Sequence, residues 1–206
     1  MFKSLNIDPE KEDRIINSAT MIFAQNGYQN ASTNAIVKEA KISKGLLFHY
    51  FNSKKELYLS LYQNASDFLS EMVIERVDWN NQDIFIRLHQ VSLIKLELFK
   101  KYPDLISFLL SVYNEKSPEV SMEINKIKAD LIYSGFQQMF ADIDVTKFKE
   151  GIDVKKAIEI IYWTFEGYAN TQQQKLKSQS IDELDHEEIV AEIDSYIEVL
   201  KNSFYR

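Results

Sequence analysis

Apolar residues recur at three- and four-residue spacing over long stretches of this 206-residue chain. This spacing brings side chains to one face of an α-helix. In the first such stretch, Ile15, Ala19, Ile22 and Phe23 form a single apolar stripe. Only 5 Gly and 3 Pro interrupt the chain, which is too few for the many turns of an all-β protein. The sequence therefore predicts an all-α fold.

Capping residues place the expected helices. Asp8-Pro9 opens the first helix and Gly27 ends it, because Asp caps, Pro suits the first helical position and Gly stops helices. Ser32 and Ser43 can cap two short helices, and Ser53 with Glu56 has the spacing of a capping box that opens a fourth. Five more helices are expected at about 82–101, 104–113, 118–141, 154–177 and 186–204, with loops at 142–152 and 174–184. We thus expect about nine helices.

Charge is divided unevenly along the chain. Residues 1–60 hold 8 Lys+Arg and 6 Asp+Glu, whereas residues 61–206 hold 16 and 25. Within 32–55 there are five lysines and one acidic residue. A local basic patch attracts the phosphates of duplex DNA, whereas an acidic body is repelled by them. We therefore expect an N-terminal three-helix DNA-binding bundle at 1–52 and a separate, acidic helical domain at 53–206.

The two short helices and the tight turn between them indicate a helix-turn-helix, whose second helix enters the major groove. Ser32 and Thr33 stand where hydroxyl and backbone N–H groups can meet a phosphate. Lys44 and Gly45 begin the second helix, and Gly lets the backbone approach closely. Leu46 lies beside the inward Leu47 but off its face, so it can meet a thymine methyl.

The run from Gly27 to Leu57 resembles the DNA-binding module of TetR-family repressors. The matching positions are Gly27, Ser32, Thr33, Ile36, Ala40, Ile42, Ser43, Gly45, Leu47, Tyr50, Phe51, Lys54 and Leu57. About a quarter of the chain carries this pattern, and its specificity lies in the joint spacing. Taken singly, most of these residues are better explained as caps, core aromatics or surface groups, and a core position is the favoured interpretation for Phe51; the joint spacing reverses this preference.

The resemblance implies roles for individual residues. Thr33, Tyr50 and Lys54 would hold phosphates. The residues implied near bases or the adjoining backbone are Asn34, Lys44, Leu46 and His49. Two positions depart from the family pattern. Phe48 replaces a Tyr that contacts phosphate, and Lys41 replaces the Gly of the turn, at a cost of about 1 kcal/mol if the backbone is left-handed there.

Aromatic residues are concentrated after the basic segment, since 19 of the 26 lie in 61–206. They can fill a core, or they can line an apolar cavity between helices that holds a ligand with a few polar groups. The resemblance implies an inducer pocket in this region. The candidate lining residues are Phe68, Phe99, Phe108, Tyr113, Tyr133, Phe136, Trp163 and Glu166.

The segment 154–177 is apolar on two faces, one around Ile161 and Phe165 and another around Ile160, Trp163 and Gly167. A helix with two apolar faces needs two partners. Burial within one chain is the alternative to a dimer, and the resemblance implies a two-fold four-helix interface with the segment 186–204. The residues expected there are Ile158, Ile161, Tyr162, Phe165, Ile189, Ile193, Tyr196, Ile197 and Leu200.

The sequence lacks the usual signatures of catalysis. It has no Cys and three His, and no metal-binding motif or Gly-rich phosphate loop is visible. We therefore expect no metal, no cofactor and no enzymatic activity. The acidic N-terminal run and the absence of about 18 consecutive apolar residues favour a cytoplasmic protein without membrane association.

Together these features predict a dimeric repressor that binds palindromic operator DNA with recognition helices about 34–36 Å apart. A small apolar or amphipathic effector would release it. Two alternatives remain open, namely an all-helical enzyme acting on an apolar substrate and a DNA-binding scaffold without a ligand.

Overall fold

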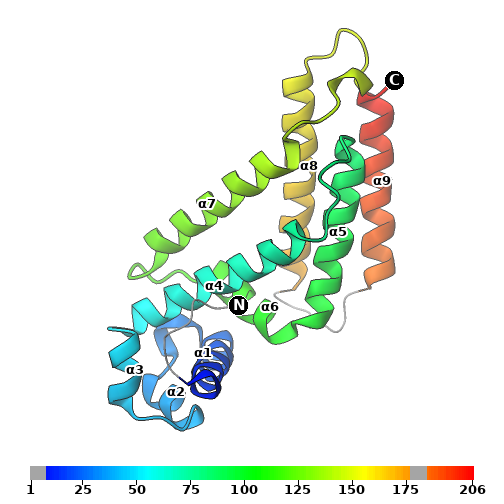
Figure 1. Cartoon of the computed structure of the whole chain (residues 1–206). Helices are drawn as coiled ribbons and strands as arrows, with labels where there is room; N and C mark the ends of the chain where they lie inside the picture. Colours follow the sequence, from blue (N-terminus) through cyan, green and yellow to red (C-terminus); the bar gives the residue numbers. More distant parts are fainter. Residues whose placement is uncertain (1–7, 177–184) are drawn as a thin grey trace. The chain divides into compact units, whose positions relative to one another are not determined.

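The structure is a computed structural model that describes residues 8–176 and 185–206 (Figure 1). The described part is helical, and its extended pairing is limited to one isolated bridge between Phe148 and Tyr205. The helices are α1 (Pro9–Asn30), α2 (Thr33–Glu39), α3 (Lys44–Tyr50), α4 (Lys54–Ile74), α5 (Ile84–Lys101), α6 (Pro103–Tyr113), α7 (Ser121–Phe140), α8 (Val154–Lys175) and α9 (His186–Phe204), with a 3-10 helix at Val145–Lys147. The prediction of an all-α fold is confirmed.

Most of the expected caps are present. The carboxylate of Asp8 accepts from the N–H of Lys11, and the Ser43 hydroxyl accepts from the N–H of Leu46 at 3.1 Å. The Ser53 hydroxyl accepts from the N–H of Glu56 at 3.0 Å, although the Glu56 carboxylate turns to Asn52 instead of closing the capping box. Two further caps are Asp153, whose carboxylate accepts from the N–H of Lys156 at the start of α8, and Asp185, whose carboxylate accepts from two N–H groups at the start of α9.

Two local predictions were wrong. Ser32 precedes α2, but its hydroxyl makes no capping hydrogen bond. Helix α7 begins at Ser121 and not at Pro118, because the carbonyl of Ser117 accepts from the N–H groups of Val120 and Ser121 and forms a turn before the helix. The expected loop at 174–184 lies mostly outside the described residues, and its first two residues belong to α8.

The described residues divide into two compact units. The N-terminal unit runs to Met72 and includes Tyr102–Ile132, so it contains α1 to α3, most of α4, all of α6 and the first part of α7. Helix α1 packs against α2 and α6, and α2 packs against α3. Its core includes the fully buried Ile15, Phe23, Ile36 and Phe108. The helix-turn-helix is thus fixed to a larger hydrophobic core.

The C-terminal unit comprises Val73–Lys101 and Tyr133–Arg206. Helix α9 packs against α5 and α8, and these three helices run side by side (Figure 1). The core of this unit includes Phe85, Phe148 and Ile161. These units are defined by how compactly their residues pack. The functional boundary expected between residues 52 and 53 therefore stays a prediction.

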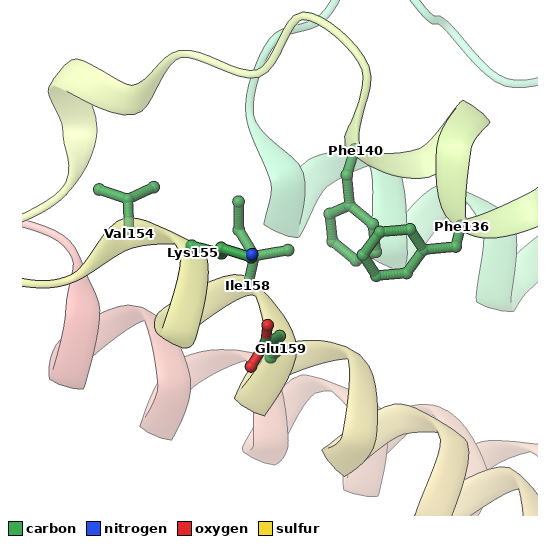
Figure 2. A pocket seen from close by; sticks show the side chains of 6 residues that line it. All are labelled: Phe136, Phe140, Val154, Lys155, Ile158 and Glu159. Carbon is green, nitrogen blue, oxygen red and sulfur yellow. The ribbon is translucent and has the colours of Figure 1, made fainter. Parts of the chain in front are cut away.

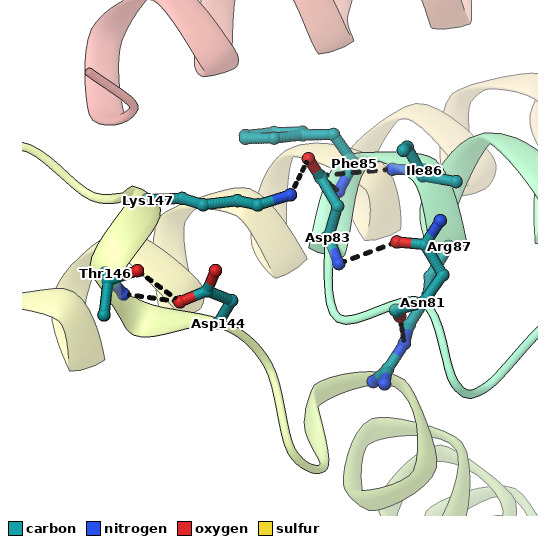
Figure 3. Close-up of polar contacts among 8 residues, drawn as sticks. All are labelled: Asn81, Asp83, Phe85, Ile86, Arg87, Asp144, Thr146 and Lys147. Atoms are coloured by element: carbon teal, nitrogen blue, oxygen red, sulfur yellow. Dashed lines mark hydrogen bonds and ion pairs between the residues drawn. The ribbon is translucent and has the colours of Figure 1, made fainter.

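A buried arginine fixes the end of α7 in the C-terminal unit, and Figure 3 shows its contact with Asn81. The Arg87 guanidinium is 2% exposed and donates to the carbonyls of Trp79, Asn81, Met139 and Ala141 at 2.5–3.1 Å. Carbonyls at a helix C-terminus lack intrahelical donors and carry partial negative charge. Arg87 therefore joins the α4–α5 connection to the last turn of α7.

The neighbouring Asp83 carboxylate is also buried. It accepts from the Lys147 ammonium at 2.9 Å and from the N–H of Phe85 at 2.9 Å. Burial opposes ionisation, but these donors, with the N–H of Ile86, hold the pKa of Asp83 below its usual range. Asp83 thus remains charged and joins the start of α5 to the 3-10 helix.

Candidate nucleic-acid interface and ligand pocket

The helix-turn-helix is held together by inward apolar residues and one long-range hydrogen bond. Ile36, Ala40 and Leu47 are buried, and they belong to the core of the N-terminal unit. The Arg14 guanidinium on α1 donates to the carbonyl of Ala40 at 3.1 Å, where α2 ends. These contacts fix α2 and α3 against α1, as a groove-binding pair of helices requires.

The turn between α2 and α3 contains a residue in the left-handed region. Lys41 has a φ of 54°, which confirms the backbone conformation considered for this position. Its N–H donates to the carbonyl of Lys38, and the N–H of Ile42 donates to that of Val37. Lys41 is exposed. A strained backbone position therefore carries a positively charged side chain on the surface.

The residues expected to contact DNA lie at the starts of α2, α3 and α4 and along α3. All of them are at least partly accessible, namely Ser32, Thr33, Asn34, Lys44, Gly45, Leu46, His49, Tyr50 and Lys54. By contrast, Leu47 is 1% exposed and Phe51 is 6% exposed. The structure therefore separates a surface set from a core set within α3, as the sequence predicted. The individual DNA contacts remain predictions.

Two lysines of this surface also contact aromatic rings. The Lys44 ammonium lies 5.9 Å from the centre of the Phe48 ring, one helical turn away. The Lys54 ammonium lies 4.7 Å from the centre of the Tyr28 ring and donates to the carbonyls of Gln29 and Ala31 at 3.1 and 3.0 Å. The sequence did not reveal that Lys54 ties α4 to the end of α1. If Lys54 contacts a phosphate, its ammonium binds that phosphate and these two carbonyls at the same time.

The residues expected to line a ligand cavity are distributed over both units. Phe108 is fully buried and packs edge-on against Tyr58 at 5.8 Å, so it is a core residue of the N-terminal unit and not a pocket residue. Phe68 and Tyr113 belong to the same unit, where Phe68 packs against Tyr102. The expected residues in the C-terminal unit are Phe99, Tyr133, Phe136, Trp163 and Glu166.

An apolar pocket of about 330 Å³ lies between α7 and α8 in the C-terminal unit (Figure 2). Phe136 and Phe140 form one side, Val154 and Ile158 the other, and Lys155 and Glu159 lie beside the apolar residues. Among the expected lining residues, Phe136 alone lines this pocket. Tyr162 supports it, because its ring packs edge-on against Phe136 at 5.1 Å. The sequence missed the α8 residues because their apolar face was assigned to a dimer interface.

The expected dimer interface is corrected in part. Four of the expected residues are at most 8% exposed in the single chain and therefore cannot face a second copy, namely Ile161, Ile189, Ile193 and Leu200. Ile158, Phe165 and Ile197 pack against the core that contains Ile161 and Leu200, and Tyr162 packs against the α7 aromatics. Tyr196 is 40% exposed and stays available.

The opposite faces of these helices are accessible. On α8, Ile160 is 42% and Trp163 is 60% exposed, and on α9 Val199 is 60% exposed. Gly167 is exposed on the same side of α8, with no atom within 4 Å of the position that a Cβ would occupy. The second apolar face identified in the sequence is thus the outward one.

The described residues also bear on metal binding and on membrane insertion. No group of three or more His, Cys, Asp or Glu side chains there is arranged to hold a metal ion. Within that same part of the chain, no helix has the length and apolar character needed to cross a membrane.

Comparison with known proteins gives matches over the helix-turn-helix and over the whole fold. A family model described as bacterial regulatory proteins, tetR family, matches residues 15–61. The HTH-type transcriptional regulator YuxN of Bacillus subtilis (strain 168) is 52% identical over 52 residues, which are 25% of this chain and 18% of YuxN. The chain thus spans less than two thirds of this relative.

Two further matches cover most of the chain. The fatty acid metabolism regulator protein of B. subtilis is 24% identical over 168 residues, which are 77% of this chain and 81% of that protein. The crystal structure of the B. subtilis regulator FadR in complex with stearoyl-CoA has a TM-score of 0.57 and 22% identity, covering 92% of this chain and 97% of that one. The second match shows a shared fold.

The left-handed Lys41 generates a stability prediction. We expect Lys41→Gly to raise the free energy of unfolding by about 1 kcal/mol, because glycine removes the steric cost of the positive φ. Urea denaturation followed by circular dichroism measures this change. Lys38→Gly is the matched control, since it places glycine inside α2 and should destabilise by about 1 kcal/mol. A Lys41→Gly protein less stable than the wild type would contradict the inference that the backbone of Lys41 is strained.

Proposed function

The chain belongs to the TetR family of bacterial transcriptional regulators, and from this premise we propose that it is a dimeric, ligand-responsive repressor of the cytoplasm. It binds a palindromic operator through the helix-turn-helix and is released by a small, largely apolar effector. The observation that carries the proposal is the accessible surface formed by α2, α3 and the start of α4 on a rigid core. We assign DNA binding to 1–52, and sensing and dimerisation to 53–206.

Charge and exposure support DNA as the partner of this surface. Lys38, Lys41 and Lys44 are exposed, and the lone acidic residue within 32–55 is Glu39. Thr33 and Tyr50 present hydroxyls suited to phosphate oxygens, and Lys44 stands at the start of α3, where side chains reach base edges in the major groove. Phosphate contacts would give affinity, and the start of α3 would give sequence preference.

We place the dimer interface on the outward faces of α8 and α9. Trp163 and Val199 are each 60% exposed, and large exposed apolar patches on soluble proteins mark interaction sites. Gly167 allows another helix to approach α8 closely. The two copies would thus meet through the apolar face that the single chain leaves open, and two-fold symmetry would present two recognition helices to a palindrome.

The pocket between α7 and α8 supports an apolar effector. Its lining is aromatic and aliphatic, and ligand pockets combine such a lining with a few polar groups. The relatives point the same way, since one is named as a fatty acid metabolism regulator and one solved structure contains stearoyl-CoA. We therefore propose an effector with a substantial hydrocarbon part.

Proteins of this family are regulators and not enzymes.

Release would follow from a conformational change of α4. Helix α4 is continuous from Lys54, beside the helix-turn-helix, to Ile74 in the C-terminal unit. An effector that favours one position of α4 would shift the recognition helices and lower DNA affinity through a coupling of about 1–3 kcal/mol.

DNA binding is tested with duplexes selected from a randomised library by the full-length protein. We expect affinity for a selected duplex to fall steeply with salt. Lys44→Ala should lower that affinity by about 1–3 kcal/mol and reduce the preference over an unselected duplex, because it removes a base contact. Fluorescence anisotropy measures both affinities.

Two variants make the test specific. Tyr50→Phe removes one phosphate hydrogen bond and should weaken both duplexes by a similar factor. Lys126→Ala removes a lysine of α7 outside the proposed surface and should change the affinity for neither duplex. Failure of the wild-type protein to enrich any duplex, or equal effects of Lys44→Ala and Lys126→Ala, would overturn the DNA assignment.

The dimer interface makes a separate prediction. Trp163→Glu should weaken dimerisation by about 2–4 kcal/mol, because a carboxylate replaces a central aromatic contact and loses hydration there. Sedimentation velocity should then show a 24.1 kDa species. Tyr133→Glu is the control, since Tyr133 is 68% exposed on α7 and lies outside this face. If Trp163→Glu leaves the dimer unchanged, α8 is not part of the interface.

A further inference from the structure

Residues 27–32, which are the last residues of α1 and the two residues before α2, form a joint with an unusual backbone conformation. Gly27 has a φ of 66° and a ψ of −179°, a region open essentially to glycine. Residues Tyr28–Asn30, the last of α1, follow this break, and Ala31 and Ser32 are extended before α2 begins at Thr33. The conformation of this joint sets where α2 starts, and Ser32 and Thr33 directly follow it.

A carboxylate distant in sequence binds this joint. Oε2 of Glu115, from the segment between α6 and α7, accepts from the N–H of Tyr28 at 2.8 Å. Oε1 of the same carboxylate accepts from the N–H groups of Lys116 and Ser117 at 2.9 and 2.8 Å. Hydrogen bonds to an ionised acceptor are about twice as strong as neutral ones. Glu115 thus joins two backbone segments through both of its oxygens.

The fit around Glu115 is close. A Cβ at Gly27 would lie 3.3 Å from Oε2 of Glu115, so a larger residue would crowd the carboxylate as well as strain the backbone. The Tyr28 ring packs against Tyr58 at 5.1 Å. Burial raises the pKa of Tyr28, and so does a hydrogen bond between its side chain and the Glu119 carboxylate. Two acids of one segment therefore hold Tyr28, one at its N–H and one at its hydroxyl.

Lys54 holds the other side of the joint. Its ammonium donates to the carbonyls of Gln29 and Ala31 and lies over the Tyr28 ring. Within residues 28–31, one N–H is thus bound by a carboxylate from the α6–α7 segment and two carbonyls by an ammonium from α4. All of these residues belong to the N-terminal unit.

We propose that Glu115 is a positioning residue for DNA recognition, which holds the α1–α2 joint so that Ser32, Thr33 and α3 meet a duplex in one fixed arrangement. The inference rests on the proposed DNA-binding function. It assigns a role to a residue far in sequence from the helix-turn-helix, within the part of the chain expected to sense the effector. It also identifies the carboxylate as necessary, since three N–H donors converge on two oxygens.

The carboxylate requirement makes a conservative substitution informative. In Glu115→Gln, the new side-chain amide has one acceptor oxygen, so it serves either Tyr28 or the Lys116 and Ser117 pair, and its NH₂ then faces an N–H donor. In Glu119→Gln, the amide oxygen still accepts from the Tyr28 hydroxyl. The two variants remove the same charge four residues apart, and only the first must lose a hydrogen bond.

The test measures the affinity of the full-length protein for a library-selected duplex and for an unselected duplex. We expect Glu115→Gln to reduce the ratio of the two affinities by about 3- to 10-fold, and Glu115→Ala by about 10-fold or more, as loss of one or more charge-assisted hydrogen bonds would do. Glu119→Gln should leave the ratio within about 2-fold of the wild type, because its hydrogen bond is kept. Loss of folded protein lowers the active fraction for both duplexes and leaves the ratio unchanged, so the ratio separates positioning from stability.

A second readout needs no DNA. Amide hydrogen exchange of residues 28–34 should be faster in Glu115→Gln than in Glu119→Gln, while exchange in α8 and α9 stays the same. An unchanged affinity ratio in Glu115→Ala, or equal reductions in both Gln variants, would overturn the proposal. If the wild-type protein selects no duplex, the DNA-binding function fails, and unchanged exchange at 28–34 would then also exclude Glu115 as the residue that holds the joint.

Discussion

The packing of three aromatic rings in the N-terminal unit holds together the helices on which the proposed DNA surface is built. Phe23 of α1, Tyr58 of α4 and Phe108 of α6 meet with ring centres 4.8–6.5 Å apart. Such aromatic contacts add about 0.5–1.5 kcal/mol per pair to the burial of apolar area. They fix α1 to a helix that continues from the helix-turn-helix and to a helix from the middle of the chain. A short helix pair gains a rigid base in this way.

On that base, polar groups determine the fine geometry. Gly27 changes the direction of the chain, and Glu115 and Lys54 bind the backbone groups that the change leaves without helical partners. Arg87 has a comparable role in the C-terminal unit, where it binds carbonyls at the end of α7. In both units a buried or half-buried charge satisfies backbone groups at a helix end, where unpaired groups would cost about 1–3 kcal/mol each.

Sequence reasoning succeeded where the signal was local. The interruption of α1 at Gly27, the cap at Ser43 and the inward position of Leu47 follow from residue types within a few positions, although α1 resumes after Gly27 and ends at Asn30. It failed where the partner is distant, since the spacing of residues cannot show that Glu115 meets Tyr28, 87 positions away. It also failed where periodicity is ambiguous, because the two apolar faces of α8 have the same spacing and only packing shows that Ile161 faces inward.

The central claim is that α2 and α3 present a surface to duplex DNA. The most direct measurement is the shift of backbone amide NMR signals of the deuterated, ¹⁵N-labelled full-length protein on addition of a library-selected duplex. The account predicts the largest changes at residues 32–34 and 44–50, with small changes in α8 and α9. Changes confined to the C-terminal unit, with residues 32–50 unaffected at saturating duplex, would contradict it.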